Sequence, residues 1–127
     1  MENSKLIIWV LRVAVAGEFV GHGALALTGK ADWVGWIQEF GVSDPVLAGQ
    51  LLFLVGCLDL AVAATVLIKP VRGVLLWAAF WGFWTALVRP LVGQSIWDFV
   101  ERSANWGAPL ALLLLMGWPK TAKEWLK

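Results

Sequence analysis

The chain has 127 residues, of which 60% are hydrophobic, and its mean hydropathy is +0.75. A soluble domain of this size has too little interior to bury so much apolar surface, so the composition favours a membrane protein. The formal net charge of +1 provides no basic surface for nucleic acid. The single cysteine, Cys57, excludes an internal disulfide, a CxxC redox pair and a cysteine-rich metal site, and no metal site is expected.

Four apolar segments approach the length of about 20 residues that a helix needs to cross a bilayer. The predicted helices cover residues 6–27, 46–68, 71–88 and 95–118. Asp44 and Pro45 are typical of a helix start, and Lys69 and Pro70 mark its end. The last segment is expected to begin near Ser95 and to bend at Pro109. The predicted fold is therefore all-α, a polytopic membrane four-helix bundle in a single domain.

Basic residues are unevenly distributed between the connecting segments. Lysines and arginines precede the first predicted helix, flank the second loop and fill the C-terminal tail. On the opposite side, acidic residues offset the basic ones. The positive-inside rule then places both termini in the cytoplasm, and the expected location is a bacterial-type inner (plasma) membrane.

The two loops predicted to face outward contain short amphipathic helices. The first has one apolar helical face, made of Trp33, Trp36, Ile37 and Phe40. Asp32 is its predicted N-cap, and Ser95 begins a capping-box pattern in the second loop. Anchoring at the membrane interface is the favoured interpretation. A lid over an outward-facing pocket, or a docking surface for a periplasmic partner, is the alternative.

Several ionisable residues lie inside predicted spans, where a charge costs about 2.5–3.5 kcal/mol and needs a partner. From their depths, at about 1.5 Å of rise per residue, Arg12 and Asp59 are predicted to form a structural ion pair. Glu18 and His22, one helical turn apart, are the predicted catalytic pair. Glu18 could exchange a proton, and His22 could donate to a ligand carbonyl or relay the proton outward. Arg89 could reach inward toward His22. Alternatively, these ionic groups only fix the register of the helices.

Aromatic residues form a stripe at helical spacing along the third predicted span: Trp77, Phe80, Trp81 and Trp84. The stripe could be a wall for a quinone ring, or it could face lipid or pack between subunits. The candidate ligand-binding residues are therefore Arg12, Asp59, Trp77, Trp81, Trp84 and Arg89. The other tryptophans fall near predicted interfaces, where indole is common, and no functional role is predicted for them: Trp9, Trp33, Trp36, Trp97, Trp106, Trp118 and Trp125.

Two glycines in the first predicted span, Gly17 and Gly21, form a small-xxx-small pair, with Gly23 close by. Small residues allow another helix or a flat ligand to approach the backbone. Close helix packing is the favoured interpretation.

A short pattern in the first predicted span consists of Leu11-Arg12, Gly17-Glu18-Phe19 and Gly21-His22-Gly23. It resembles the first helix of DoxX-like proteins, which are small four-helix membrane proteins. Asp59 after Gly56 is similar to the acidic position of that family, whereas Lys30 follows the His-Gly pair later than the family's lysine does. The resemblance implies a membrane subunit of an oxidoreductase, such as thiosulfate:quinone oxidoreductase. Quinone is then the implied ligand, and electrons would come from partner subunits.

Two other functions fit the sequence. Small multidrug exporters also place one glutamate in their first membrane helix, so the chain could be a proton-coupled transporter that works as a homodimer. Arg12, Asp59 and the long outward loops argue against that interpretation. The chain could also be a purely structural accessory subunit of a larger membrane complex.

Overall fold

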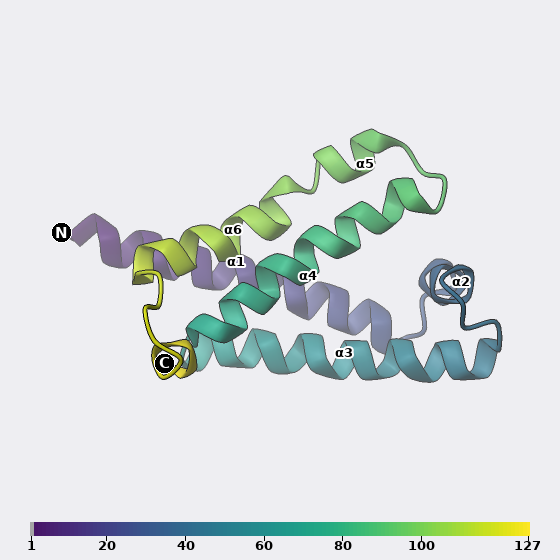
Figure 1. The fold of residues 1–127 in the computed structure, drawn as a ribbon, viewed down its shortest axis with the longest axis horizontal. Helices are drawn as coiled ribbons and strands as arrows, with labels where there is room; N and C mark the ends of the chain where they lie inside the picture. Colours follow the sequence, from purple (N-terminus) through teal and green to yellow (C-terminus); the bar gives the residue numbers. More distant parts are fainter. Residues whose placement is uncertain (1) are drawn as a thin grey trace.

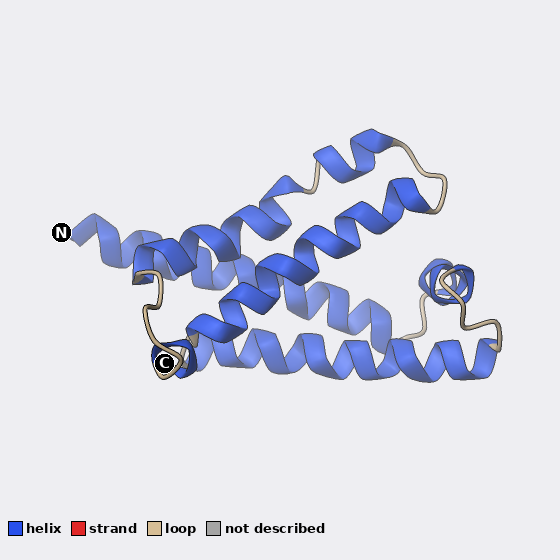
Figure 2. Ribbon diagram, viewed as in Figure 1, coloured by secondary structure: helices blue, strands red, loops and turns tan. Residues whose placement is uncertain are grey.

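The computed structural model describes residues 2–127, and all regular secondary structure in this range is helical (Figure 2). The elements are α1 (Glu2–Leu27), α2 (Ala31–Glu39), α3 (Pro45–Ile68), α4 (Arg72–Leu91), α5 (Ile96–Val100), α6 (Ser103–Met116) and the 3-10 helix η1 (Glu124–Leu126). Three of these helices, α1, α3 and α4, are long and apolar enough to cross a membrane. The predicted all-α class is therefore confirmed, together with three candidate spans.

The ends of α3 follow directly from its sequence. The Asp44 side chain accepts a hydrogen bond from the Val46 N–H at 3.1 Å, and Pro45 occupies the first helical position. This arrangement satisfies one of the N–H groups that a helix start leaves free. The helix ends at Ile68, just before Lys69 and Pro70, as the sequence predicts.

The last predicted span is divided into two helices. Ser95 caps α5, because its hydroxyl accepts from the Trp97 N–H at 3.2 Å. The chain is then interrupted at Glu101 and Arg102, before α6 begins. Pro109 lies inside α6, so the interruption comes earlier than the predicted bend.

Figure 1 shows α1 lying along α3, and α4 lying along α6. The start of α1 and η1 lie at one end of the fold, here called the terminal end, and α2 and α5 lie toward the opposite, distal end. Arg72, at the start of α4, donates to the carbonyls of Met116 at 2.5 Å and of Gly117 at 2.9 Å. The end of α6 therefore meets the start of α4, and the two helices are antiparallel.

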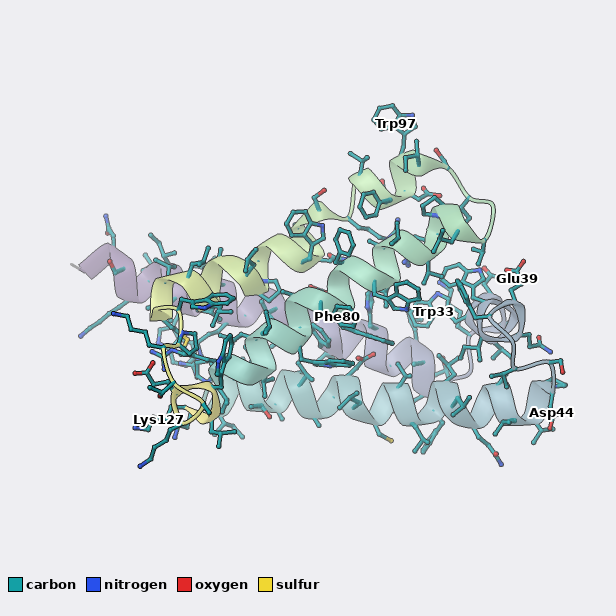
Figure 3. The ribbon with its side chains drawn as sticks, viewed as in Figure 1. Trp33, Glu39, Asp44, Phe80, Trp97 and Lys127 are labelled. Atoms are coloured by element: carbon teal, nitrogen blue, oxygen red, sulfur yellow. The ribbon has the colours of Figure 1, made fainter. Side chains whose placement is uncertain are left out.

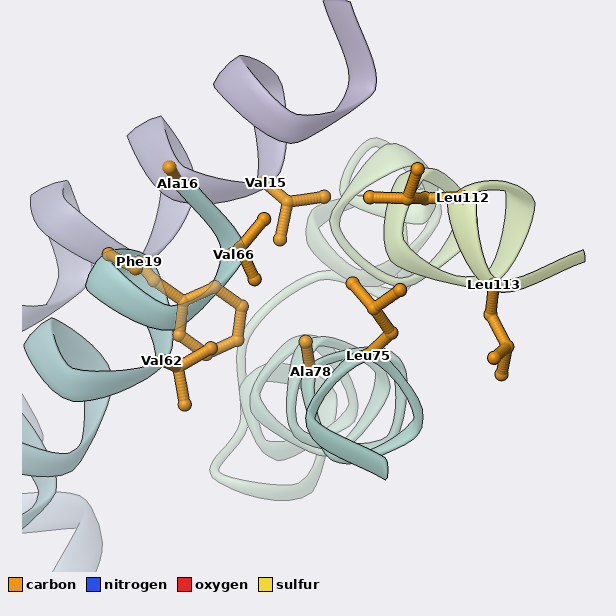
Figure 4. Packing of buried hydrophobic residues seen from close by; sticks show 10 residues of the cluster. Val15, Ala16, Phe19, Val62, Val66, Leu75, Ala78, Leu112 and Leu113 are labelled. Carbon is orange, nitrogen blue, oxygen red and sulfur yellow. The ribbon is translucent and has the colours of Figure 1, made fainter. Parts of the chain in front are cut away.

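The hydrophobic core lies where α1, α3, α4 and α6 meet (Figure 4). Phe19 of α1 is fully buried there, with Val66 of α3, Leu75 of α4 and Leu112 of α6. Other large apolar side chains on α1 and α3 are exposed along the outside, among them Val13, Val20, Phe53, Leu54 and Leu58. This exposed apolar belt suits contact with lipid.

Close helix packing depends on glycines other than the predicted pair. A Cβ on Gly56 would lie 3.0 Å from the Gly23 carbonyl oxygen, so α1 and α3 touch at their backbones. A Cβ on Gly82 would overlap the backbone of Asn105 on α6. Gly17 and Gly21 are exposed, and a Cβ added at either position would have nothing within 4 Å. The packing predicted for this pair therefore does not occur within the described chain.

Candidate functional site

A cavity of about 140 Å³ lies between α3 and α4, and α2, which is at the distal end of the fold (Figure 1), forms one wall. It is lined by five aromatic side chains: Trp33, Trp36, Phe40, Trp81 and Trp84. Its polar lining comes from four helical side chains: His22 of α1, Asp59 of α3, and Thr85 and Arg89 of α4. The space exists because α3 packs mainly on α1 and α2, while α4 packs mainly on α6.

Helical spacing explains why these residues share one cavity. On α3, Leu52, Val55 and Asp59 are three and four residues apart, and they line one face. On α4, Trp81, Trp84, Thr85, Val88 and Arg89 repeat the same intervals. The aromatic stripe predicted on this helix is therefore divided, since Trp81 and Trp84 line the cavity and Trp77 does not.

Trp77 lies nearer the terminal end, outside the cavity, where it packs against the core. Its ring stacks on Trp81 with centroids 5.4 Å apart and an interplanar angle of 16°. The Phe80 and Trp77 ring centroids lie 5.8 Å apart, and Phe80 is otherwise exposed (Figure 3). Trp77 thus supports the wall residue Trp81 and has no direct access to the cavity.

The predicted ion pair between Arg12 and Asp59 is wrong. The Arg12 Nε–H donates to the Val66 carbonyl at 2.9 Å, and a second guanidinium N–H donates to the carbonyl of Leu67. The Arg12 guanidinium also lies 3.9 Å from the centroid of the Trp9 ring. Arg12 therefore binds the end of α3 and does not reach the cavity.

Asp59 is 2% exposed and lines the cavity wall. Its Oδ1 atom is buried, and no described residue donates a hydrogen bond to it. The only ion pair within residues 2–127 joins Arg102 and Glu101 on the outer surface at 2.9 Å. A buried carboxylate without a partner is costly, so this side chain is a strong indicator of a binding site.

Arg89 is 6% exposed and lines the cavity from the last turn of α4. It donates one hydrogen bond, to the Thr85 carbonyl at 2.6 Å. Its guanidinium lies 5.2 Å from the centroid of the Trp36 ring, at cation–π distance. The sequence predicted that Arg89 would reach toward His22, and both side chains line the same cavity.

Helix α2 covers the distal side of the cavity and is here called the lid (residues 31–39, with Phe40 just after it). The rings of Trp33 and His22 meet edge to face at 5.7 Å, and the Phe40 and Trp84 rings lie 5.9 Å apart. Lys30 lies over Trp33 at 4.9 Å and is also the N-cap residue of the helix, in place of the predicted Asp32. The apolar face of α2 therefore forms one wall of the cavity, which is the arrangement that the lid interpretation requires.

Glu18 does not line the cavity. It lies one turn from His22 toward the terminal end, and its Oε2 atom is buried without a hydrogen-bond partner among the described residues. Asp59 lies on α3, the helix against which α1 packs most closely. Glu18 thus lies outside the cavity lining, on the same helix face as His22.

The lid residues Trp33, Trp36, Ile37 and Phe40 were predicted to meet the membrane interface, and the structure places them in the cavity wall. The sequence signal was their helical periodicity, which an interface helix and a lid share. Leu52, Val55, Thr85 and Val88 complete the lining. In the sequence, only their helical spacing from Asp59 and Trp84 indicates that these four residues line the cavity.

No family model matches this chain, and neither a curated protein nor a solved structure matches it. Within the described residues, no group of three or more His, Cys, Asp or Glu side chains could hold a metal ion. An aromatic cavity with a buried acceptor, Asp59, and a buried donor, Arg89, is suited to a small flat polar molecule.

Proposed function

We propose that this chain is a multi-pass membrane subunit of a redox or respiratory-type assembly, and that its cavity binds a quinone head group. One observation carries the proposal: a single cavity brings five aromatic rings together with His22, Asp59 and Arg89. Aromatic walls suit a flat ring, and buried polar groups fix its orientation. The resemblance to DoxX-like proteins supports the quinone-linked role.

The size of the cavity suits one ring. A cavity of about 150 Å³ can hold benzene, and the volume here is about 140 Å³. An isoprenoid tail would therefore lie outside the cavity, along the apolar surfaces of the helices. Trp81 and Trp84 would contact one part of the ring, and the lid residues Trp33 and Trp36 would contact another.

The polar side chains have separate roles in this proposal. A quinone accepts two electrons and two protons when it is reduced. Arg89 donates a hydrogen bond to an oxygen on the ring, and its charge stabilises negative charge that develops there. His22 and Asp59 exchange protons with the ring oxygens. Glu18, outside the cavity lining, exchanges protons with His22 and Asp59. Electrons come from a partner subunit.

In the proposed membrane topology, the chain crosses the bilayer four times. Helices α1, α3 and α4 make three crossings, and α5 with α6 makes the fourth, because the end of α6 lies beside the start of α4. The basic residues Lys5, Lys69, Arg72 and Lys120 are on the side of both termini, which by the positive-inside rule is the cytoplasm of a bacterial-type inner membrane. The lid then lies on the outer side.

Proton-coupled transport by a homodimer is the second candidate function. The observation in its favour is that Glu18 and Asp59 both have a buried carboxylate oxygen without a partner in the described chain. Membrane-embedded carboxylates of this kind are typical of proton-coupled sites. A purely structural accessory subunit would leave these oxygens without a purpose.

Mild extraction from the native membrane, followed by mass spectrometry of co-purifying proteins and small molecules, tests the proposal. Stoichiometric redox subunits together with a bound quinone are the expected result. A homodimer that carries neither would overturn the redox-subunit proposal and favour transport. Stoichiometric partners without any redox group or quinone would instead favour a structural accessory role.

A further inference from the structure

An acidic and a basic side chain, Asp59 and Arg89, line the cavity without pairing. Asp59 is 2% exposed and Arg89 is 6% exposed, so both are shielded from water. No ion pair joins them within 4.0 Å, and neither pairs with another charged side chain among residues 2–127. Burial of an unpaired charge is costly, and a ligand that contacts both groups would remove that cost.

The two groups require different ligand atoms. In its ionised form the Asp59 carboxylate only accepts hydrogen bonds, and its buried Oδ1 has no donor from the described chain. A guanidinium has five N–H donors, and Arg89 is seen to donate to one acceptor, the Thr85 carbonyl. The complementary ligand therefore has a donor for Asp59 and an acceptor for Arg89.

Aromatic walls and a small volume define the remainder of the ligand. Trp36 and Phe40 from the lid, and Trp81 and Trp84 from α4, surround a space of about 140 Å³. That space fits a single six-membered ring with small substituents. A hydroxyl group on such a ring is a donor of the required kind, and a second ring oxygen is the acceptor.

We propose that the cavity selects a hydroxylated aromatic ring, in which the hydroxyl donates a hydrogen bond to Asp59 and a second oxygen accepts one from Arg89. This inference rests on the proposed function and deepens it, because a hydroquinone has such a hydroxyl and a quinone has only acceptors. When Asp59 is ionised, the cavity therefore binds the reduced form of the ring more tightly than the oxidised form. Asp59 is the residue that determines this selectivity.

A matched pair of redox-inert probes tests the inference: 4-(trifluoromethoxy)phenol and its methyl ether, 4-(trifluoromethoxy)anisole. The two differ only at the group that would face Asp59. Binding is measured by ¹⁹F NMR with the full chain in lipid nanodiscs, and empty nanodiscs correct for partition into lipid. Only the phenol can donate a hydrogen bond to Asp59. The phenol should therefore bind at least about tenfold more tightly than the methyl ether.

The variant Asp59→Asn tests whether Asp59 causes the preference for the phenol. Arg12→Gln is the control, because Arg12 does not reach the cavity. The preference for the phenol should fall to about twofold or less in Asp59→Asn and remain in Arg12→Gln. Equal affinity of the wild-type protein for both probes would overturn the inference, while ring binding itself would stay intact. If neither probe binds above empty nanodiscs, both the inference and the quinone site fail. If Asp59→Asn does not fold, the comparison of the two probes on the wild-type protein still decides the result.

Discussion

Asp59 on α3 and Arg89 on α4 line the same cavity with opposite charges, and no ion pair joins them. Arg12, by contrast, is held by the carbonyls of Val66 and Leu67 at the end of α3. Arg12 thus ties α1 to the end of α3, whereas Asp59 and Arg89 remain open to a ligand, and Glu18 is a further ionisable side chain in α1 that does not line the cavity.

Arg12 and Asp59 should behave as independent sites in a double-mutant cycle with Arg12→Gln and Asp59→Asn. The coupling free energy should be within about 0.5 kcal/mol of zero, because the two side chains share no partner. Asp59→Asn alone should leave the free energy of unfolding unchanged or higher, since it removes an unpaired buried charge. Reversible unfolding in mixed micelles measures these values. A coupling of several kcal/mol would mean that the two residues form an ion pair after all.

Gly82→Ala should destabilise the fold by about 1–3 kcal/mol, because the added methyl group overlaps the Asn105 backbone on α6. Gly17→Ala is the matched control, since nothing lies within 4 Å of a Cβ at that position. The control should be neutral or slightly stabilising in the same unfolding assay. Equal losses for both variants would contradict the close contact between α4 and α6.

Arg72→Ala should release the C-terminal segment. Arg72 donates to the carbonyls of Met116, Gly117 and Lys127, with the last at 3.2 Å, so one side chain holds both the end of α6 and the end of the chain. Because the site is partly exposed, we expect a loss of about 1–2 kcal/mol. Limited trypsin digestion should cleave at Lys120 and Lys123 faster in this variant.

Lys69→Ala is the control for the trypsin experiment, because Lys69 is exposed and its side chain makes no hydrogen bond within the described chain. Its digestion pattern in the tail should match that of the wild-type protein. An unchanged cleavage rate in Arg72→Ala would show that the tail is held by other contacts, such as the packing of Trp118 on Trp125.

Trp36→Leu should weaken binding of a ring probe by about tenfold, because it removes an aromatic wall of the cavity and the cation–π partner of Arg89. Trp97→Leu is the control, since Trp97 is 71% exposed and points away from the other helices (Figure 3). The phenol probe and ¹⁹F NMR measure both affinities. Similar losses in the two variants would argue that α2 is an interface helix and does not act as a lid.

Glu18→Gln should leave ring binding intact, because Glu18 does not line the cavity. It should slow proton uptake during quinone reduction, by about 10²-fold if proton transfer limits the rate. Proteoliposomes of the native assembly with an internal pH dye measure that uptake. Unchanged proton uptake, with normal insertion, would leave Glu18 as a structural residue.

Hydropathy and helix-capping residues predicted most of the fold, whereas the orientation of side chains around each helix could not be predicted. Depth arguments placed Arg12 and Asp59 near the same level, but they cannot show which way a side chain points. Pro70 has no N–H to satisfy the Val66 carbonyl, so that carbonyl is free to accept from Arg12. The prediction from Lys69 and Pro70 covered only where the helix ends. The two residues also indicate that a carbonyl near this end lacks its helical N–H donor.

The lid shows a second limit of prediction from sequence. Trp33 and Trp36 have the periodicity of an amphipathic helix, which reveals an apolar face but not the medium that it meets. Lipid and an aromatic cavity favour the same residues. The weak contact between α3 and α4 leaves room for this face, while α4 packs closely on α6, where Gly82 meets the Asn105 backbone.

Photoaffinity labelling of native membranes with an azido-quinone, followed by mass spectrometric mapping of the modified residues, most directly tests whether the cavity is a quinone site. We predict that the label is found on α2 between Trp33 and Phe40 and on α4 between Trp81 and Arg89. An excess of unlabelled quinone should compete with this labelling. Labelling that is confined to exposed tryptophans such as Trp97 and Trp118, or that resists competition, would contradict a quinone site in this cavity.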